Sequence, residues 1–299
     1  MALLPFDDRD GWIWLDGAFV PWRDAQVHVL THGLHYASAV FEGERAYAGH
    51  IFRLREHTER LIGSARILGF EIPFDAATID AACVETLARN GLTEGYLRPI
   101  AWRGSEQLSV AAPDSRIHLA IACWPWPNLF GAAKEQGVRL TWARWKRPHP
   151  ETAPTASKAA GLYMIGTLAK HEASAAGFDD ALMLDWKGDV SEATGANAFF
   201  VMEGALHTPT PVNFLDGITR RTVMALARRR QIEVVERTIA AAEPARAEEI
   251  FLVGTAAEVT PVRQLDDTLF TPGRITTMLR QDYEALVRQP PEEVARLIG

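Results

Sequence analysis

The stretch Trp124-Pro125-Trp126-Pro127-Asn128-Leu129-Phe130-Gly131 predicts the boundary between two domains. It contains two prolines and one glycine in eight residues, a composition that interrupts helices and strands and is typical of interdomain connections. We therefore predict a linker over residues 124–134, a smaller N-terminal α/β domain over residues 1–123 and a larger C-terminal α/β domain over residues 135–299.

The apolar pattern on each side of this linker changes between the two-residue period of strands and the 3.6-residue period of helices. Before it, we predict a hairpin around Asp16-Gly17, a strand pair formed by residues 39–43 and 50–53, helices over residues 54–68 and 76–90, and strands over residues 96–103 and 117–124. After it, we predict strands over residues 138–144, 180–185, 198–201, 232–237 and 250–253 and helices over residues 161–176, 219–231 and 245–249. The predicted fold class is therefore α/β, with mixed α+β elements in two domains.

The composition excludes several classes of protein. The 299 residues carry 31 Lys and Arg against 38 Asp and Glu, a formal charge of −7, and this balance disfavours binding along nucleic acid. Two cysteines, Cys83 and Cys123, are too few for a disulfide scaffold or a four-cysteine zinc site and suit a reducing cytosol. Acidic residues precede any long apolar stretch, and no run approaches the roughly 20 apolar residues of a membrane span. We expect a cytoplasmic protein without a signal peptide that acts on small molecules.

Common motifs for nucleotides and metals are missing from the sequence. It contains no GxGxxG, P-loop or HExxH pattern. His28, His32 and His35 have no carboxylate or cysteine at ligand spacing, so we predict no metal site.

Lys158 stands alone among small residues in the stretch 154–163, just before a predicted helix. A lysine in so apolar a setting is partly desolvated, which favours the neutral, nucleophilic amine. The same pattern also fits a surface lysine at the start of a helix, so this stretch alone leaves both interpretations open.

Three further stretches complement an amine nucleophile. Residues 214–221 lead from a proline-rich loop to Thr219 at a predicted N-cap, where free N–H groups and the helix dipole form an anion site. Residues 254–260 are mostly small and let backbone amides approach a ligand, and Glu192 places one carboxylate among the small residues 190–197. Each stretch alone also fits an ordinary cap or turn. Together with Lys158 they match the needs of pyridoxal 5′-phosphate: an amine, donors for the phosphate and an acid for the pyridine nitrogen.

Motifs along nearly the whole chain carry a resemblance to one family. They stand, in this order, at residues 27–36, 40–43, 55–61, 154–163, 190–197, 214–221 and 254–262. In these motifs the chain resembles the class IV (fold type IV) aminotransferases, and among them the branched-chain amino acid aminotransferases. The resemblance implies a two-domain fold with pyridoxal 5′-phosphate at the domain interface. It also implies a homo-oligomer, at least a dimer, with the active site near the subunit interface.

The resemblance also assigns the residues that bind the cofactor. Lys158 matches the Schiff-base lysine, which moves the proton between the substrate Cα and the cofactor C4′. Glu192 matches the partner of the pyridine nitrogen, and Tyr163 matches the tyrosine that hydrogen-bonds the ring hydroxyl. The remaining contacts, to the phosphate and the ring, are assigned to Arg60, Leu215, Ile218, Thr219 and Thr255.

The implied substrate pocket accepts an apolar side chain and a carboxylate in alternate half-reactions. The α-carboxylate is assigned to the amides of Thr255, Ala256 and Ala257, and the side-chain pocket to Tyr36, Phe41, Gly43, Arg45, Tyr96, Arg98 and Trp126. Tyr96-Leu97-Arg98 resembles the Tyr-x-Arg pair that receives the distal carboxylate of glutamate. The implied reaction is a ping-pong transfer of the amino group between a branched-chain L-amino acid (Leu, Ile or Val) and 2-oxoglutarate.

Several positions depart from the family pattern. Leu162, Ser109, Asp216 and Ala196 stand where a polar residue, a glycine, a proline and an acid are usual. Glu44 lies next to Arg45 in the sequence, and we expect it to temper the charge of that arginine. These departures leave the cofactor residues intact and concern the wall of the substrate pocket.

Three alternative functions, two of them enzymatic, are compatible with the same fold. A transaminase for D-amino acids or (R)-amines is disfavoured by Tyr96-Leu97-Arg98, because a different pair is expected there. A lyase similar to aminodeoxychorismate lyase would use the same lysine and phosphate site but has no purpose for the Tyr-x-Arg pair. A non-enzymatic binding protein would not need Lys158, Glu192, Arg60 and Tyr163 together.

Overall fold

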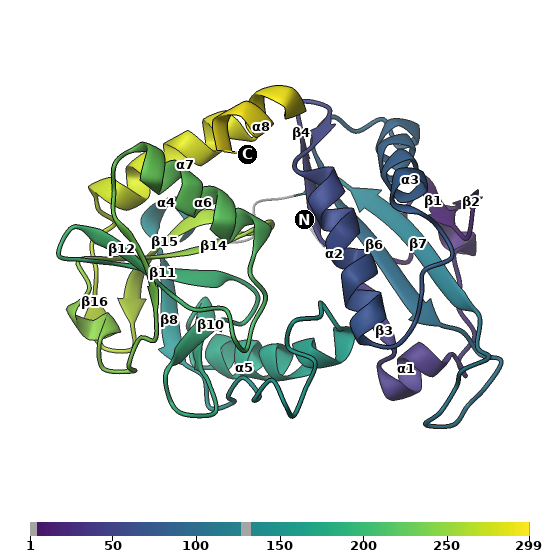
Figure 1. Ribbon diagram of the computed structural model, residues 1–299, viewed down its shortest axis with the longest axis horizontal. Coiled ribbons are helices and arrows are strands. Elements are labelled where there is room, and N and C mark those ends of the chain that lie inside the picture. The colour runs from purple at the N-terminus through teal and green to yellow at the C-terminus, as the bar shows by residue number, and fades with distance from the viewer. Residues whose placement is uncertain (1–4, 127–132, 299) are drawn as a thin grey trace. The chain divides into compact units, whose positions relative to one another are not determined.

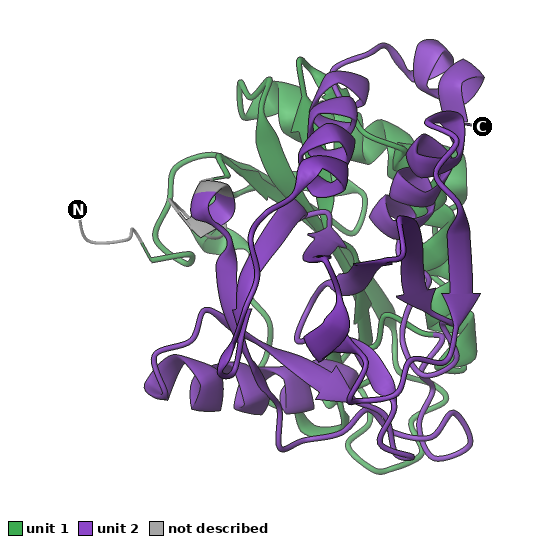
Figure 2. Cartoon of the chain, turned by 90° about the vertical axis from the view of Figure 1, so that its left-hand side faces the viewer, with its two compact units in different colours: residues 1–126, 157–161 green, residues 127–156, 162–299 purple. Residues whose placement is uncertain are grey.

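The computed structural model describes residues 5–126 and 133–298, and Figure 1 shows the order of its helices and strands. The chain forms two compact units, one of residues 1–126 with 157–161 and the other of residues 127–156 with 162–299 (Figure 2). Residues 127–132 of the predicted linker lie outside the described residues. The segment 157–161, which we predicted within the C-terminal domain, belongs to the first unit, because its backbone is bonded to residues of that unit.

The first unit is built on an antiparallel sheet. Among the described residues its strands are β1 (Trp12–Leu15), β2 (Ala18–Pro21), β3 (Ala39–Phe41), β4 (Glu44–Tyr47), β5 (His50–Ile51), β6 (Gly95–Arg103) and β7 (Ile117–Trp124). They follow the order β2-β1-β7-β6-β4-β5, and β3 also pairs with β6. The predicted hairpin around Asp16-Gly17 is confirmed as β1 and β2.

The second predicted strand pair is wrong in its partners. Residues 39–41 pair with β6, whereas residues 50–51 pair with β4. Ala48 and Gly49 both have positive φ, at +50° and +84°, which is the conformation of a two-residue hairpin turn. Such a turn joins the residues directly before and after it, so the partner of β5 has to be β4.

Two helices cover one face of this sheet (Figure 1). They are α2 (Leu54–Ile67) and α3 (Ala76–Arg89), whereas the short α1 (His32–Tyr36) lies outside this layer. Both long helices match the predicted ranges, because Leu61, Ala65, Ile79 and Cys83 recur on the buried sides and pack with the sheet in one apolar core. Asp75 caps α3 by accepting from the Thr78 N–H (2.8 Å), and Gly91 follows its end at φ +64°.

The second unit contains a larger, mixed sheet. Among the described residues its strands are β8 (Val138–Trp142), β9 (Asp180–Leu184), β10 (Val190–Ala193), β11 (Asn197–Met202), β12 (Ala205–Pro209), β13 (Val234–Arg237), β14 (Glu249–Gly254), β15 (Glu258–Leu265) and β16 (Thr268–Leu269). The order is β10-β9-β8-β15-β14-β11-β12-β13, with β16 on β15. Parallel pairs join β8 to β9, β8 to β15 and β12 to β13.

The helices of the second unit are α4 (Ala133–Gln136), α5 (Tyr163–Ala175), α6 (Ile218–Arg229), α7 (Arg274–Leu286) and α8 (Pro291–Ile298). The predicted helix over residues 245–249 is instead a 3₁₀ turn at Pro244–Arg246, and Glu249 begins β14. Of residues 254–260, predicted to bring backbone amides near a ligand, only 255–257 form a connection, since β15 starts at Glu258 and pairs back onto β14. Among the described residues, no helix is both long and apolar enough to cross a membrane.

Candidate active site

Lys158 is held by its backbone to α2 and β3 of the first unit. Its N–H donates to Ser64 Oγ (3.0 Å), its carbonyl accepts from the Phe41 N–H (3.2 Å), and the neighbouring Ala159 forms a bridge with Val40. The Ser157 hydroxyl donates to the Ser64 carbonyl (3.0 Å). These contacts fix where the side chain starts, and its Nζ lies 5.2 Å from the centre of the Phe41 ring.

Arg60 projects from α2 toward a buried acid that sequence reasoning did not assign. Its Nε and Nη2 donate to Glu42 at 2.7 and 2.8 Å. His57, one turn earlier on α2, lies with Nδ1 2.7 Å from the same carboxylate. Arg60, the predicted phosphate ligand, is therefore oriented by two neighbours within its own unit.

Aromatic rings and Arg98 form a connected row in the first unit. The Trp126 ring stacks on Tyr96 with centroids 4.4 Å apart, and the Tyr96 hydroxyl accepts from Arg98 Nη2 (3.1 Å). The Arg98 Cζ in turn lies 4.6 Å from the centre of the Phe41 ring. Five predicted residues are thus brought together: Lys158, Phe41, Arg98, Tyr96 and Trp126.

Gly43 supports the same row because it has no side chain. A Cβ at this position would overlap the hydroxyl and ring of Tyr96. The Tyr96 ring is almost completely buried, 5% exposed, so it has little room to give way. Only glycine leaves Tyr96 in the place where Arg98 bonds it.

Arg45 and Tyr36, two further residues predicted for the substrate pocket, pack on rings other than those of this row. Arg45 stacks its guanidinium over Tyr47, with Cζ 4.9 Å from the ring centre. The expectation that Glu44 tempers its charge is wrong, because consecutive strand residues point to opposite faces and Glu44 is completely buried beside Cys83. Tyr36 is 44% exposed at the end of α1 and packs on His32, with centroids 4.7 Å apart.

Glu192, the acid predicted to pair with the ring nitrogen, is buried in the second unit. It is 9% exposed and lies on β10, where Asn197 Nδ2 donates to its Oε2 (3.2 Å) and Arg147 Nη2 lies 3.3 Å from its Oε1. Asn197 and Arg147 were not predicted. Both orient the carboxylate, and Arg147 places a positive charge beside it.

The start of α6 is joined to this acid through Asn197. Nδ2 of Asn197 also donates to the Leu215 carbonyl (3.2 Å), and a Cβ on Gly217 would overlap Asn197 Oδ1. The predicted N-cap is wrong by two residues: Gly217 is the N-cap, it makes no side-chain capping bond, and Ile218 and Thr219 are the first helical residues. Because glycine has no side chain, residue 217 does not cap the N–H groups in the first turn of α6. An anion site at a helix start requires such uncapped N–H groups.

The remaining predicted residues also lie in the second unit. Tyr163 begins α5 and lines a cavity of about 220 Å³ with Gly166, Thr167, Lys170, His171 and Thr194. Thr255, Ala256 and Ala257 connect β14 to β15, whose ends pair at Gly254 and Glu258. The Ala257 carbonyl accepts from the Thr260 hydroxyl, which fixes this connection.

A comparison with known protein families shows to which family this chain belongs. Residues 39–265 match the model of the amino-transferase class IV family. The chain belongs to the class IV aminotransferases. The predicted family is confirmed.

Curated relatives and solved structures agree with this membership. The branched-chain-amino-acid aminotransferases of Pseudomonas aeruginosa and Escherichia coli K12 are 41% and 38% identical to it, each over 94% of both chains. The structure of a branched-chain aminotransferase from Thermoproteus uzoniensis with norvaline matches with a TM-score of 0.92 and 37% identity, over 97% of this chain and 99% of the other. A structure of the Escherichia coli branched-chain amino acid aminotransferase matches with a TM-score of 0.91 and 37% identity, over 93% of this chain and 95% of the other. The predicted fold class is confirmed by these likenesses.

The residues that sequence reasoning missed in this class IV aminotransferase support the predicted ones. They are Glu42, His57, Ser64, Arg147 and Asn197. Two signals could have found them: Glu42 and Asn197 stand inside the recognised motifs, and His57, Arg60 and Ser64 share one face of α2 at helical spacing. Arg147 gave no such signal, because it reaches Glu192 from a loop far away in the sequence.

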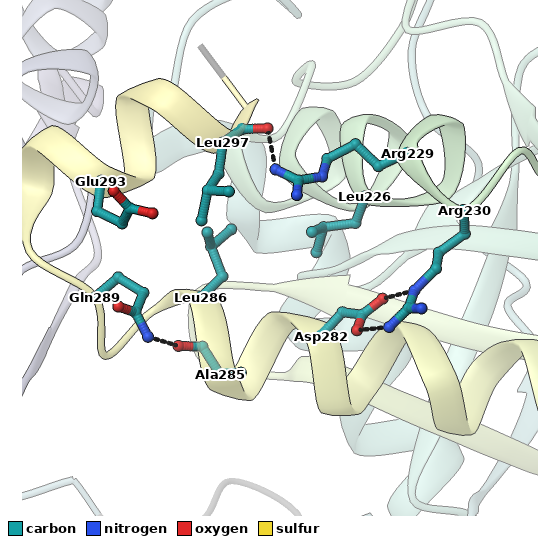
Figure 3. A pocket seen from close by; sticks show the side chains of 9 residues that line it. All are labelled: Leu226, Arg229, Arg230, Asp282, Ala285, Leu286, Gln289, Glu293 and Leu297. Carbon is teal, nitrogen blue, oxygen red and sulfur yellow. Dashed lines mark hydrogen bonds and ion pairs between the residues drawn. The ribbon is translucent and has the colours of Figure 1, made fainter.

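A second cavity of the class IV aminotransferase has no part in this arrangement. It measures about 410 Å³ and lies among α6, α7 and α8 (Figure 3), lined by Leu226, Arg229, Arg230, Asp282, Ala285, Leu286, Gln289, Glu293 and Leu297. Arg230 forms two hydrogen bonds with Asp282 (2.6 and 2.8 Å), and Arg229 donates to the Leu297 carbonyl (2.7 Å). None of the predicted site residues is among the described residues that line it.

Proposed function

We propose that this class IV aminotransferase transfers an amino group between a branched-chain L-amino acid and 2-oxoglutarate, with pyridoxal 5′-phosphate as cofactor. The observation that carries the proposal is the row in which Lys158 and Arg98 both lie over the Phe41 ring, at 5.2 and 4.6 Å from its centre. The curated relatives carry the name branched-chain-amino-acid aminotransferase, and solved relatives hold norvaline or N-(5′-phosphopyridoxyl)-L-glutamate.

The donor chemistry of the two units fits the cofactor. Pyridoxal phosphate supplies a ring that accepts the electron pair left when the substrate Cα loses its proton. In the first unit Arg60 offers guanidinium donors for the phosphate. In the second unit the first turn of α6 offers N–H donors, and Glu192 offers an acid for the ring nitrogen. Lys158 supplies the amine, which also moves the proton at Cα.

The row of aromatic rings and Arg98 explains how one pocket accepts two unlike side chains. Phe41, Tyr96 and Trp126 offer apolar walls for a leucine, isoleucine or valine side chain. Arg98, which bonds the Tyr96 hydroxyl, offers a charged partner for the distal carboxylate of glutamate or 2-oxoglutarate. Alternation between these partners is what a ping-pong reaction with both substrates needs.

The proposal includes a homodimer. Three apolar side chains, Val29, Leu34 and Val110, are 71%, 65% and 84% exposed. Their two segments are joined, since His32 Nε2 lies 2.8 Å from the Ser109 carbonyl. A second copy of the chain would cover this apolar surface and the half-exposed Tyr36. Leu34→Glu should turn the oligomer into a monomer in sedimentation, whereas an unchanged mass would refute this surface.

The proposal also places the protein in the cytoplasm. Both cysteines are free and buried in the first unit, as suits a reducing compartment. Fractionation of cells that express the protein would test this, and recovery outside the cytoplasmic fraction would refute it.

The decisive experiment is a panel of half-reactions followed by the cofactor's visible absorption. L-Leu, L-Val and L-Glu should each change the spectrum, whereas D-Ala and an (R)-arylamine should not. Arg98→Ala should lower kcat/KM for glutamate about 10- to 100-fold more than for leucine, because it removes a charge-assisted hydrogen bond that only glutamate makes. Arg116→Ala, an exposed arginine on the same unit, is the matched control. A response to D-Ala or the amine alone would favour the alternative transaminases, and a colourless protein would refute the cofactor.

A further inference from the structure

Glu42 is a buried carboxylate with an unusually complete set of donors. Its side chain is 0% exposed. Oε1 accepts from Arg60 Nε (2.7 Å), and Oε2 accepts from Arg60 Nη2 (2.8 Å), His57 Nδ1 (2.7 Å) and the Gly43 N–H (3.3 Å). Two side chains from one helix and one backbone group therefore hold this acid in a single orientation.

The pKa shifts of Glu42 and His57 are consistent with this hydrogen-bond geometry. Burial alone would raise the pKa of Glu42, but the charge and hydrogen bonds of Arg60, with those of His57, lower the pKa well below its ordinary value. Burial lowers the pKa of His57, the charge and hydrogen bond of Glu42 oppose this, and the positive charges of Arg60 and Lys158 add to the lowering, so the net shift is downward. These shifts favour an ionised Glu42 paired with the Arg60 guanidinium, and a neutral His57 imidazole whose Nδ1–H donates to the carboxylate.

The pairing also determines which edge of Arg60 faces Glu42. A carboxylate that bonds Nε and Nη2 occupies the side edge of the planar guanidinium and fixes its plane. The terminal edge, formed by Nη1 and Nη2, is then directed away from Glu42. This edge has the geometry to bind two oxygens of a phosphate.

The helix that carries Arg60, α2, also positions the amine nucleophile Lys158 through a backbone hydrogen bond. Ser64, one turn after Arg60 on α2, is 1% exposed and accepts from the Lys158 N–H through its Oγ. One face of α2 therefore sets both the start of the Lys158 side chain and the direction of the Arg60 guanidinium. Any rotation of Arg60 would change the distance between the two points at which the cofactor is held.

We infer that Glu42 and His57 are positioning residues, which orient Arg60 so that its terminal edge binds the cofactor phosphate. This inference rests on the proposed function, because it needs pyridoxal phosphate as the ligand. Glu42 acts through Arg60, and His57 acts through Glu42. An ion pair that served only the stability of the fold would not distinguish a phosphorylated ligand from one without phosphate.

The test compares the dissociation constants of pyridoxal 5′-phosphate and pyridoxal, measured on the apo form of the full chain by tryptophan fluorescence. Glu42→Gln places an amide N–H against the N–H groups of Arg60, so the guanidinium has to turn away. We expect this variant to weaken pyridoxal phosphate about 10- to 100-fold, the range for one lost charge-assisted interaction. The dissociation constant of pyridoxal should change by less than about threefold, because that ligand makes no contact with Arg60.

Two further variants make the result specific. His57→Phe keeps the ring volume but removes the donor to Glu42, and it should shift the ratio of the two constants in the same direction by a smaller factor. Asp80→Asn is the matched control, since Asp80 is an acid of α3 that binds Arg55 and Thr58 of α2 but not Arg60. It should leave the ratio unchanged.

The outcomes separate the inference from the proposed function. Equal weakening of both ligands by Glu42→Gln, or an unchanged ratio in Glu42→Gln and His57→Phe, would overturn the positioning role while pyridoxal phosphate still binds the wild-type chain. Equal affinity of the wild-type chain for both ligands would overturn Arg60 as a phosphate ligand and the inference with it. Failure of the wild-type chain to bind either ligand would refute the cofactor itself.

Discussion

Glu42 and Glu44 are two glutamates with the same chemistry and the same burial, but their pKa values are shifted in opposite directions. Both are 0% exposed. Glu42 is surrounded by donors, and its pKa is lowered. Glu44 lies on the helix-covered face of β4 with Cys83 close by, and among the described residues neither of its carboxyl oxygens has a hydrogen-bond partner of ordinary geometry.

The difference follows from the neighbours rather than from depth. Burial, with the negative charges of Glu42 and Asp80, raises the pKa of Glu44 well above its ordinary value and so favours its neutral form. The Cys83 thiol is a weak donor and offsets little of this. The surroundings of Glu42 therefore stabilise a carboxylate, whereas those of Glu44 favour the protonated acid.

The largest expected effect is the loss of Glu42. Glu42→Met leaves Arg60 without its carboxylate, and we expect it to lower the free energy of unfolding at pH 7 by about 3–5 kcal/mol, the usual cost of breaking a buried ion pair. Since the pKa of Glu42 is lower in the folded chain, its contribution is complete at neutral pH and is lost as the pH falls below about 4.3, the unfolded value. Urea unfolding across this range should therefore show a gap between wild type and variant that narrows in acid. A gap independent of pH would contradict the ionised form.

Gly43, which stands between the two glutamates, should give the next largest effect. Gly43→Ala displaces Tyr96, which bonds Arg98 and stacks on Trp126. We expect kcat/KM to fall about 100-fold, because a displacement of about 1 Å in a positioning group has consequences of this size. Gly63→Ala on α2 is the control, since a Cβ there meets no atom within 4 Å. Steady-state kinetics that leave both variants alike would argue against the close approach of Tyr96.

Glu44→Met should change the free energy of unfolding in the opposite direction to Glu42→Met. It replaces a buried acid, whose weak donor is the Cys83 thiol, by an apolar side chain of similar length, and we expect the free energy of unfolding to rise by about 1–2 kcal/mol at pH 8. Because the pKa of Glu44 is raised in the folded chain, the folded state keeps the proton longer and loses stability as the pH rises above about 4.3. The gain should therefore be smaller at pH 5 than at pH 8. Thermal unfolding at both pH values would measure it, and a destabilised variant would mean that Glu44 has a partner.

The smallest expected effect concerns the anchor of Lys158. Ser64→Ala removes the acceptor of the Lys158 N–H, and we expect kcat to fall about fivefold, equivalent to about 1 kcal/mol. Ser174→Ala, an exposed serine on α5, should have no effect on kcat. Equal rates for wild type and Ser64→Ala would show that the remaining bonds of the segment suffice to hold Lys158.

The local elements were the part of the fold that the sequence predicted well. The helices α2 and α3 were predicted within a residue or two, because their apolar residues recur with the helical period and Gly91 ends the second. Strand partners were less predictable. β3 was assigned to the wrong neighbour, because its partner β6 lies about 60 residues further along the chain. β15, which pairs with the adjacent β14, was missed because the small residues 254–260 carry no apolar strand pattern.

By itself, the sequence determined the family and the chemical groups, because the lysine, the acids and the motifs in their order are local properties of the chain. Only the tertiary structure decided in which direction the pKa of each buried acid is shifted. Glu42 and Glu44 differ by two positions and look alike in the sequence, but Arg60 and His57 approach one of them and an apolar core surrounds the other. The ionisation of a buried carboxyl depends on the charges and donors that packing brings within a few ångströms, and no local pattern carries that information.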